Sequence, residues 1–377
     1  MKILVICYEF PPLGGGGGKV ARDVATVLGA RGHEVCVQTS AFRGLPEQEL
    51  LEGITVRRNK VLRRRAEGAS IFGMGIYVLA SFLPAFRTAR RFRPDVIHAH
   101  FAVPSGAVAY AVSKLLRIPF VITFHLGDVP GGAPSQTDAA FRIVMPFVRR
   151  IVAAAAALTA VSSFVRDLAE RAFSRTVTVI PNGVSGRSSE RSTSGRQEPV
   201  RLIFVGRFNS QKNLGLTIEA LGGLLDQDWT LDLVGDGPDM AKARDLVSAL
   251  RLVERVRFHG WVEPETVDRI MAVADVLLIP SKFEGMPVAA VNALRHGLAI
   301  VGSTAPGLAD VLLDGVNGAA APVDDMVAFR TGLAELMSDH QRLGAYQAAS
   351  LDLCERFSLD RIVDSYEAVL AQAATAG

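Results

Sequence analysis

The sequence has few cysteines and no recognisable export signal. Only Cys7, Cys36 and Cys354 occur in 377 residues, and no two of them form a C-x-x-C pair. An odd and widely spaced set excludes a disulfide framework and does not indicate a zinc site. The apolar N-terminal run is short and ends at Pro11-Pro12 and a run of glycines, so no secretion signal is predicted. We therefore expect a protein of the reducing cytoplasm.

Net charge is also small, but it is unevenly distributed. The formal total is +3, whereas residues 1–180 hold 23 Lys and Arg against 12 Asp and Glu, and residues 181–377 hold 18 against 26. The two halves thus carry +11 and −8. This asymmetry suggests that the N-terminal half meets an anionic surface or substrate.

One uncharged segment needs comparison with a membrane span. Ala69–Phe86 is 18 residues long, at the lower limit for a spanning helix, and contains Gly73, Gly75 and Pro84. Arginines flank both ends, including Arg63–Arg65, so charge gives no orientation. We expect a buried or groove-lining helix. A helix lying on the membrane is the second interpretation and a true span the third.

Short apolar runs recur between helical stretches throughout the chain. Runs that are apolar at every position are typical of parallel strands covered on both faces, and they predict two doubly wound α/β domains. We expect domains at residues 1–182 and 183–358, joined through a linker at Ser185–Pro199, and a C-terminal helix in residues 359–377 that packs back on the first domain. The runs are Ile3–Cys7, Glu34–Thr39, Val96–Phe101, Phe120–Phe124, Leu158–Val161, Val177–Ile180, Leu202–Val205, Leu231–Val234, Val256–Phe258, Val276–Ile279 and Ala299–Val301.

In such sheets ligands bind beyond the carboxyl ends of the strands. After the first predicted strand, Gly14–Gly18 leads into a predicted helix at Val20–Ala30, where free N–H groups could hold an anion. As a dinucleotide fingerprint this run is poor. His98 and His100 end another strand and should share one face; packing is the favoured role for both. His125, followed by Gly127 and Asp128, is a stronger candidate for a site residue.

The second half has cations and an acid at its strand ends. Arg207 and Lys212 follow one strand at the start of a helix and suit a diphosphate leaving group. Trp261 follows Gly260 and could hold a base or pack in the core. Glu284 precedes Gly-Met-Pro at a helix start, where it could also be only a favourable first-turn acid.

Taken together, these motifs resemble the family-4 retaining glycosyltransferases. That family has the GT-B fold, in which two Rossmann-like domains face each other across a deep cleft. Ten motifs occur in the family's order: PPLGGGGG, DVIHAH, TFHLGD, LTAVSSFVRD, VIPNGV, VGRFNSQKN, LVGDGP, VRFHGWV, PSKFEGMP and PGLADVLLDGVNG. The resemblance implies that the N-terminal domain binds the acceptor and the C-terminal domain a nucleotide-sugar donor.

The resemblance also implies roles for individual residues. His125, Arg207, Lys212 and Glu284 would be catalytic, with Arg207 and Lys212 on the donor diphosphate in place of a metal. The acceptor side would use Glu9, Gly17, His100 and Asp128. The full implied donor set is Gly15, Gly16, Arg207, Lys212, Trp261, Val262, Glu284, Gly285, Met286, Pro287, Val288 and Asn292. No metal and no cofactor other than the donor substrate is expected, and Asp226-Gln-Asp228 is predicted to be a turn.

One position departs from the family pattern. Asn292 stands eight residues after Glu284, where the family has a second Glu. A carboxylate could accept hydrogen bonds from both ribose hydroxyls, whereas an amide offers one oxygen and an NH2 donor. Asp310 likewise stands where the family often has Glu. Weaker nucleotide binding, or a deoxyribose donor, is the resulting hypothesis.

The implied reaction is the metal-independent transfer of a hexose-type sugar, with retained configuration, to an acceptor hydroxyl. The leading expectation is a polyprenyl-linked acceptor in cell-surface polysaccharide or glycolipid assembly, with contact to the inner face of the cell membrane. A soluble small-molecule acceptor is the second expectation. An inactive GT-B scaffold is the alternative of another class, suggested only by Asn292. A nucleic-acid partner is not expected, because the basic region lacks interleaved aromatic residues.

Overall fold

The chain divides into two compact units. The computed structural model describes residues 1–375 apart from 14, 43, 62–70, 133 and 187–198, and describes only the backbone of residues 71–72 and 134–141. Unit 1 comprises Met1–Gly183 and Leu359–Gly377, and unit 2 comprises Val184–Ser358. The expectations for Gly14, Arg63–Arg65 and most of the predicted linker lie outside the described residues.

Unit 1 is built on a sheet with the order β3-β4-β2-β1-β5-β6-β7-β8. All neighbouring pairs are parallel except β3 with β4. Central strands β5 and β6 are buried at every position, as expected for strands covered on both faces. The strands are β1 (Lys2–Cys7), β2 (Glu34–Ser40), β3 (Gln48–Leu51), β4 (Ile54–Asn59), β5 (Val96–His100), β6 (Phe120–Phe124), β7 (Ala157–Ala160) and β8 (Thr178–Val179).

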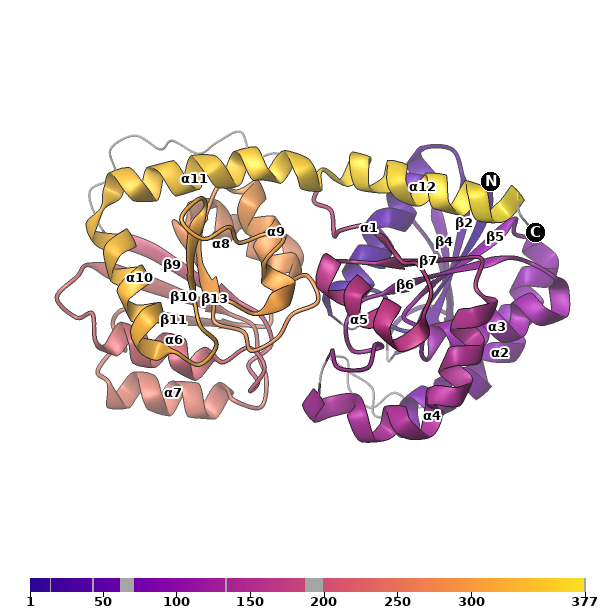
Figure 1. The fold of residues 1–377 in the computed structure, drawn as a ribbon, viewed down its shortest axis with the longest axis horizontal. Coiled ribbons are helices and arrows are strands. Elements are labelled where there is room, and N and C mark those ends of the chain that lie inside the picture. The colour runs from indigo at the N-terminus through magenta and orange to yellow at the C-terminus, as the bar shows by residue number, and fades with distance from the viewer. Residues whose placement is uncertain (14, 43, 62–70, 133, 187–198, 376–377) are drawn as a thin grey trace. The chain divides into compact units, whose positions relative to one another are not determined.

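Helices cover both faces of this sheet (Figure 1). Helix α1 (Gly16–Ala30) packs with the C-terminal helix α12 (Leu359–Thr375), whereas α2 (Ile71–Phe92) packs with α3 (Ser105–Leu116). Right-handed crossovers place α1 on one face and α2 and α3 on the other. Helix α4 (Pro134–Ala154) contacts both α3 and α5 (Ser163–Phe173).

Two sequence expectations need correction in unit 1. Helix α1 begins at Gly16 and not at Val20, so the glycines form its first turn. The hairpin of β3 and β4 was not predicted, because its strands carry charged residues and are not uniformly apolar. Glu52 and Gly53, both with positive φ, form its two-residue turn, which matches the twist of paired strands.

Helix α2 contains most of the uncharged segment considered for a membrane. Tyr77, Ser81 and Ala85 recur every four residues and are buried, while Leu79 and Leu83 on another stripe are exposed. One stripe therefore packs on the sheet, in agreement with the helix that we expected. Among the residues that the structure describes, no helix has the length and apolar character needed to cross a bilayer.

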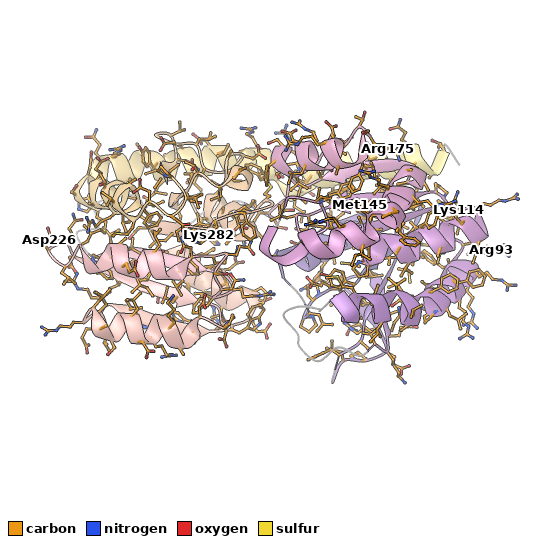
Figure 2. All side chains as sticks on the ribbon, turned by 60° about the horizontal axis from the view of Figure 1, so that its bottom comes forward. Arg93, Lys114, Met145, Arg175, Asp226 and Lys282 are labelled. Atoms are coloured by element: carbon orange, nitrogen blue, oxygen red, sulfur yellow. The ribbon has the colours of Figure 1, made fainter. Side chains whose placement is uncertain are left out.

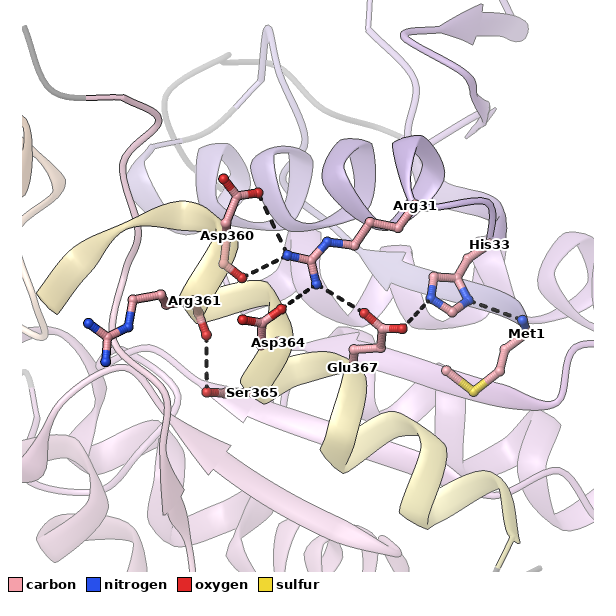
Figure 3. A network of polar contacts seen from close by, with 8 residues as sticks. All are labelled: Met1, Arg31, His33, Asp360, Arg361, Asp364, Ser365 and Glu367. Carbon is pink, nitrogen blue, oxygen red and sulfur yellow. Dashed lines mark hydrogen bonds and ion pairs between the residues drawn. The ribbon is translucent and has the colours of Figure 1, made fainter. Parts of the chain in front are cut away.

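The C-terminal helix is held to unit 1 by packing and by charge. Its apolar stripe, including Ile362, Val363 and Tyr366, is buried. At its edge the Arg31 guanidinium, after the end of α1, lies 2.6 Å from Asp364 and 3.0 Å from Glu367 (Figure 3). His33 contacts the other Glu367 oxygen at 3.0 Å.

Unit 2 repeats the doubly wound arrangement. Its parallel sheet has the order β11-β10-β9-β12-β13-β14, the Rossmann order when the strands are renumbered from β9. The sequence missed β14, whose four residues are glycine and alanine and give no strand signal. The strands are β9 (Val200–Val205), β10 (Trp229–Val234), β11 (Val256–Gly260), β12 (Val276–Ile279), β13 (Ala299–Ser303) and β14 (Gly318–Ala321).

Two helix layers enclose the core of unit 2. Helices α6, α7 and α10 form one contiguous layer, and α9 packs with α11. Trp229 at the start of β10 is fully buried, and its indole N–H donates to the Leu224 carbonyl at 2.8 Å. The helices are α6 (Leu214–Gly222), α7 (Met240–Ala249), α8 (Pro264–Val273), α9 (Val288–Arg295), α10 (Met326–Ser338) and α11 (His340–Cys354), with 3₁₀ turns η1 (Pro306–Leu308) and η2 (Glu355–Phe357).

Candidate active site

The candidate residues of unit 2 lie where its strand order reverses. Strands β9 and β12 are neighbours, and the strands that follow them lie on opposite sides, so the loops after them diverge and leave room for a ligand. Arg207 and Lys212 belong to the loop after β9, and Glu284 belongs to the loop after β12. The fold therefore brings together cations and an acid that are more than seventy residues apart in the sequence.

Lys212 and Glu284 form a close ion pair. Lys212 Nζ lies 2.6 Å from Glu284 Oε1, and the two side chains are 21% and 6% exposed. An ion pair with so little solvent is screened weakly, which makes each charge sensitive to loss of the other. Glu284 lies before α9, which begins at Val288, so the interpretation of Glu284 as a first-turn acid is wrong.

Hydrogen bonds join the loop after β9 to the loop after β12. The amide of Lys282 donates to the Gln211 carbonyl at 2.8 Å, and the Gln211 side chain donates to the Phe283 carbonyl at 3.0 Å. Gly307 of η1 lies against the same loop, where a Cβ would come within 1.9 Å of the Glu284 carbonyl oxygen. The backbone around Glu284 is thus fixed from two sides.

Arg207 lies on the same loop as Lys212 and is partly exposed. The neighbouring loop after β10 supports it, because the Phe208 amide donates to the Asp236 carbonyl at 2.9 Å. Gly235, with φ +134°, permits this close approach, since a Cβ there would lie 1.9 Å from the Gly206 carbonyl oxygen. The sequence motif V-G-D-G-P therefore allows the loop after β10 to pack closely against the loop that carries Arg207.

Four further donor candidates lie in the same loop as Glu284 or in the helix that follows it. Gly285, Met286 and Pro287 are buried between Glu284 and the start of α9, but Pro287 has no N–H to offer. Asn292 lies in the second turn of α9 and is partly exposed. Figure 2 labels Lys282, an exposed neighbour of Lys212 that pairs with Asp324 at 2.8 Å.

Trp261 follows β11 and is 59% exposed, so it does not pack in the core. Val262 beside it is partly exposed. The positive φ of Gly260 turns the chain out of the strand at this point. The exposed indole and backbone are available to a ligand.

In unit 1 the strand order reverses between β1 and β5, and the glycine loop lies there. A Cβ on Gly17 would come within 2.5 Å of Phe101 and 3.2 Å of His125 Nδ1, so only glycine fits. The Gly15 amide donates to Glu9 Oε2 at 3.3 Å, and Gly15 caps α1 without a side chain. The loop thus brings backbone N–H groups at the start of α1 next to His125.

His125 is held neutral by its surroundings. Its side chain is 8% exposed, and burial, together with nearby His98, lowers its pKa to about 3. Its Nε2 lies 3.2 Å from His100 Nδ1, and its ring centroid is 4.4 Å from that of Phe101. A neutral imidazole offers one donor and one acceptor, and adds no positive charge to the site.

Asp128 positions His125. Its carboxylate accepts from the amides of Ala102 at 2.8 Å, His125 at 3.0 Å and Leu126 at 3.2 Å. Burial raises the Asp128 pKa, and these backbone bonds oppose the rise. Because all three partners are backbone N–H groups and the residue is 2% exposed, Asp128 joins the loops after β5 and β6 instead of facing a ligand.

Behind His125 lies a buried column of rings. His98 and His100 share one face of β5 with centroids 4.3 Å apart, as alternation predicted, and Tyr366 of α12 lies 5.3 Å beyond His98. Both histidines are fully buried, so His100 is a support of His125 and not a surface group. The sequence did not indicate a role for Tyr366, which lies on the buried apolar face of α12.

Phe101 was also missed as part of this site. It has φ +75°, which is uncommon for a bulky residue, and its ring lies between Tyr8 and His125. Its place directly after His100 was the only signal in the sequence. Phe101 links the loop after β5 to the glycine loop.

The described residues contain no group of three or more His, Cys, Asp or Glu side chains that could hold a metal ion. Asp226 and Asp228 lie in a turn before β10, as predicted. The charges at the candidate site of unit 2 come instead from Arg207, Lys212 and Glu284.

Comparison with known proteins gives a consistent result. The chain is 26% identical to the N-acetyl-alpha-D-glucosaminyl L-malate synthase of Bacillus anthracis, over 98% of this chain and 96% of that protein. It is 27% identical to the 2-deoxystreptamine N-acetyl-D-glucosaminyltransferase of Streptomyces fradiae, over 98% and 94%.

Solved structures share the fold of the whole chain. The sucrose-phosphate synthase of Thermosynechococcus elongatus has a TM-score of 0.81 at 19% identity, covering 100% of both chains. Anabaena Alr3699/HepE in complex with UDP-glucose has a TM-score of 0.78 at 21% identity, covering 98% of this chain and 99% of that one.

Family matches account for both units. Residues 14–185 match Glycosyltransferase Family 4, and residues 187–350 match Glycosyl transferases group 1. The chain belongs to the family-4, group 1 glycosyltransferases and has their GT-B fold of two Rossmann-like units.

Proposed function

We propose that this glycosyltransferase moves a hexose-type sugar from a nucleotide-diphosphate sugar to an acceptor hydroxyl, without a metal and with retained configuration. The observation that carries the proposal is the weakly exposed Lys212–Glu284 pair beside Arg207, at the point where strand order reverses. This arrangement supplies two cations for a diphosphate and an acid for sugar hydroxyls.

The cations act on the leaving group. As the bond from the sugar C1 to the phosphate oxygen breaks, negative charge grows on the diphosphate, and fixed cations lower the free energy of that state. The Arg207 fork can bind two oxygens, and the Lys212 ammonium has three donors, so it can bind phosphate while keeping Glu284. Glu284 and the amides of Gly285, Met286 and Val288 hold the sugar.

The acceptor hydroxyl supplies the new bond to C1. Its proton passes to an oxygen of the departing phosphate, and the products are the glycoside and the free nucleoside diphosphate. We assign His125, neutral and next to Gly17, to a hydrogen bond with the reacting sugar, and Gly15 and Gly16 to the donor phosphate. Glu9 and Gly17 belong to the acceptor side, with His100 and Asp128 supporting His125.

Nucleotide recognition falls to Trp261, Val262 and Asn292. The exposed Trp261 ring and the Val262 backbone contact the base. Asn292 lies where a second glutamate would bind the ribose, and its amide gives weaker bonds than a carboxylate. We expect a modest preference for ribose, or acceptance of a deoxyribose donor.

For the acceptor we propose a lipid-linked sugar in cell-surface polysaccharide or glycolipid assembly, used at the inner face of the cell membrane by a cytoplasmic protein. Support comes from unit 1, where exposed Leu79 and Leu83 of α2, and Ile143 and Phe147 of α4, accompany exposed arginines. Apolar and cationic side chains together suit an anionic membrane surface.

A soluble small acceptor is the second candidate. Two relatives that align over nearly the whole chain are named for small acceptors, L-malate and 2-deoxystreptamine. Release of nucleoside diphosphate with a soluble acceptor alone, and none with lipid-linked sugars, would favour this candidate.

The experiment is a donor screen followed by product analysis. Nucleotide sugars that raise the melting temperature are incubated with each acceptor class in EDTA, and free nucleoside diphosphate and the anomeric configuration are measured. Arg207→Gln and Lys212→Gln should abolish turnover, whereas Lys282→Gln, which alters an exposed neighbouring lysine, should not. Full turnover in Arg207→Gln and Lys212→Gln would contradict their assigned roles, and no turnover by the wild type with any donor and acceptor would favour an inactive scaffold.

A further inference from the structure

A small cavity lies in unit 1 away from the proposed active site. It has a volume of about 230 Å³, lies between the end of α2 and the sheet, and is partly open to solvent, with Arg91 exposed and Arg57 partly exposed. Cys36 and Thr55 are register partners near the amino ends of β2 and β4, whereas the glycine loop and His125 follow the carboxyl ends of their strands. Its lining residues are Cys36, Thr55, Arg57, Thr88, Arg91 and Phe92.

The cavity is cationic. Arg57 and Arg91 line it, and none of its described lining residues is acidic. The acids in and next to β2 and β3 are already paired: Glu34 with Lys2, Glu49 with Arg58, and Glu47 with Lys60. The positive charge of the cavity is therefore left without a compensating carboxylate among the described residues.

One donor here is buried without an acceptor. Arg57 Nε is shielded from solvent and makes no hydrogen bond to any residue that the structure describes. Buried donors are nearly always bonded to protein, water or an ion, because an unmade bond costs the full desolvation of the group. An acceptor that enters the cavity would remove that cost.

The other lining groups are neutral. Burial raises the pKa of the Cys36 thiol to about 11 and outweighs the opposing effects of the Arg57 charge and of a hydrogen bond between Arg57 and the thiol, so the thiol adds no negative charge. The Thr88 hydroxyl already donates to Gln38 Oε1 at 3.0 Å. Arg57, Arg91 and the Thr55 hydroxyl are thus the groups that can donate to a ligand.

We propose that this cavity binds a phosphate group, either as a small phosphate ester or as inorganic phosphate, between Arg57 and Arg91. Guanidinium forks match phosphate oxygens in pairs, which a single ammonium cannot do. The volume of about 230 Å³ is below the 300–1,000 Å³ or so of drug-sized ligand pockets and is ample for a single phosphate group.

The phosphate could come from a free metabolite or from a lipid headgroup. Further cations lie at this end of the helix layer, and Figure 2 shows Arg93 and Lys114 near the ends of α2 and α3. They would attract either source, and the test must therefore separate the two.

Calorimetry on the full chain tests the proposal. The parent protein carries Arg207→Gln and Lys212→Gln, so that the proposed donor site cannot bind the probe and failure there cannot be mistaken for failure here. We expect inorganic phosphate to bind this parent, and Arg91→Gln to weaken that binding at least tenfold. Arg57→Lys, which keeps the charge but loses the fork, should weaken it similarly. Arg90→Gln, which alters an exposed arginine that does not line the cavity, should not.

The source follows from two further probes, glycerol 3-phosphate and vesicles that contain phosphatidic acid. Arg91-dependent binding of the small phosphates identifies a free ligand, and Arg91-dependent binding of vesicles alone identifies a lipid headgroup; either supports a phosphate site. Circular dichroism and melting temperature establish that the variants are folded. The proposal is overturned if neither phosphate source binds the parent, or if Arg91→Gln and Arg57→Lys bind both as the parent does.

Discussion

The two units share a doubly wound topology but differ in the chemistry at the point where their strand order reverses. Unit 2 places Lys212 and Glu284 there as a weakly exposed ion pair with Arg207 nearby, whereas unit 1 places neutral His125 against glycine and aromatic rings. The shared fold fixes where a ligand can bind, and the side chains decide which ligand chemistry each half serves.

The net charge of each half does not predict where the proposed phosphate-binding cations lie. The N-terminal half carries +11 and the C-terminal half −8, yet the proposed diphosphate-binding cations lie in the acidic half. A bound diphosphate is governed by charges within a few ångströms, because more distant exposed charges are screened by salt. Net charge therefore describes the surroundings of a site and not the site itself.

Removing the charge of unit 2 should have the largest effect. We expect Glu284→Gln to reduce kcat by about 10²–10³, because it removes a sugar contact and leaves Lys212 unpaired in a weakly exposed place. Steady-state kinetics measure the effect. Asp324→Asn, which removes the partner of exposed Lys282, is the matched control and should retain kcat. Equal kinetics for the two variants would contradict the assigned difference between the pairs.

Lowering the pH should destabilise mainly unit 1. His98 and His125 have pKa values of about 3 in the folded protein, and that of His100 is well below its usual value, all because of burial. The unfolded chain takes up these protons near pH 6.5, so folding stability is lost as the pH falls below that value. We expect about 2 kcal/mol lost at pH 5 for each histidine that stays neutral.

Denaturant unfolding at several pH values measures this loss. His98→Gln should reduce the slope of stability against pH, and His340→Gln, on an exposed helix start, should leave it unchanged. A slope that is the same in wild type and His98→Gln would show that His98 is not held neutral.

Placing a carboxylate at position 292 of unit 2 should strengthen ribose binding. Asn292→Glu adds a carboxylate to unit 2 that can accept both ribose hydroxyls, and we expect about tenfold tighter binding of a ribonucleoside diphosphate. Binding of the 2′-deoxy analogue should change much less. Calorimetry with both nucleotides measures the difference, and an equal gain for both would exclude a ribose contact.

The ion pairs of α12 should contribute least. Arg31 and His33 lower the pKa of Glu367, so this contribution is complete above the usual range of a glutamate and is lost as the pH falls through the lowered value. The groups are partly exposed, and we expect Arg31→Ala to cost about 1 kcal/mol near neutral pH. Thermal unfolding with and without salt measures it. A much larger loss would mean that Arg31 also packs apolar surface.

Much of the fold could be predicted because parallel strands leave a clear signal. Phe120–Phe124 and Val276–Ile279 were predicted with their observed bounds, since each is a short apolar run buried on both faces. The strand at 54–59 was missed because its buried and partly exposed positions alternate and it includes arginines, so it is not a uniformly apolar run. The short strand at Gly318–Ala321 gives no signal, and pairing with β13 alone forms it.

The candidate site, like the fold, was predicted only in part. Position after a strand was enough to mark His125, Arg207, Lys212 and Glu284, and their functional roles stay predictions. The sequence could not show that the Asp128 carboxylate accepts hydrogen bonds from three backbone amides. Nor could it show that Tyr366, more than 240 residues from His125, supports His125 through the two buried rings of His98 and His100. Such contacts depend on tertiary packing, which local patterns do not encode.

The central claim is that local cations of unit 2, and no metal, hold the donor diphosphate. Its most direct test is calorimetry of a panel of nucleoside diphosphates against wild type, Lys212→Gln and Lys282→Gln, each with and without EDTA. We predict that EDTA changes nothing, that Lys212→Gln weakens binding at least tenfold, and that Lys282→Gln binds as wild type does. Loss of wild-type binding in EDTA, or unchanged binding in Lys212→Gln, would contradict the claim.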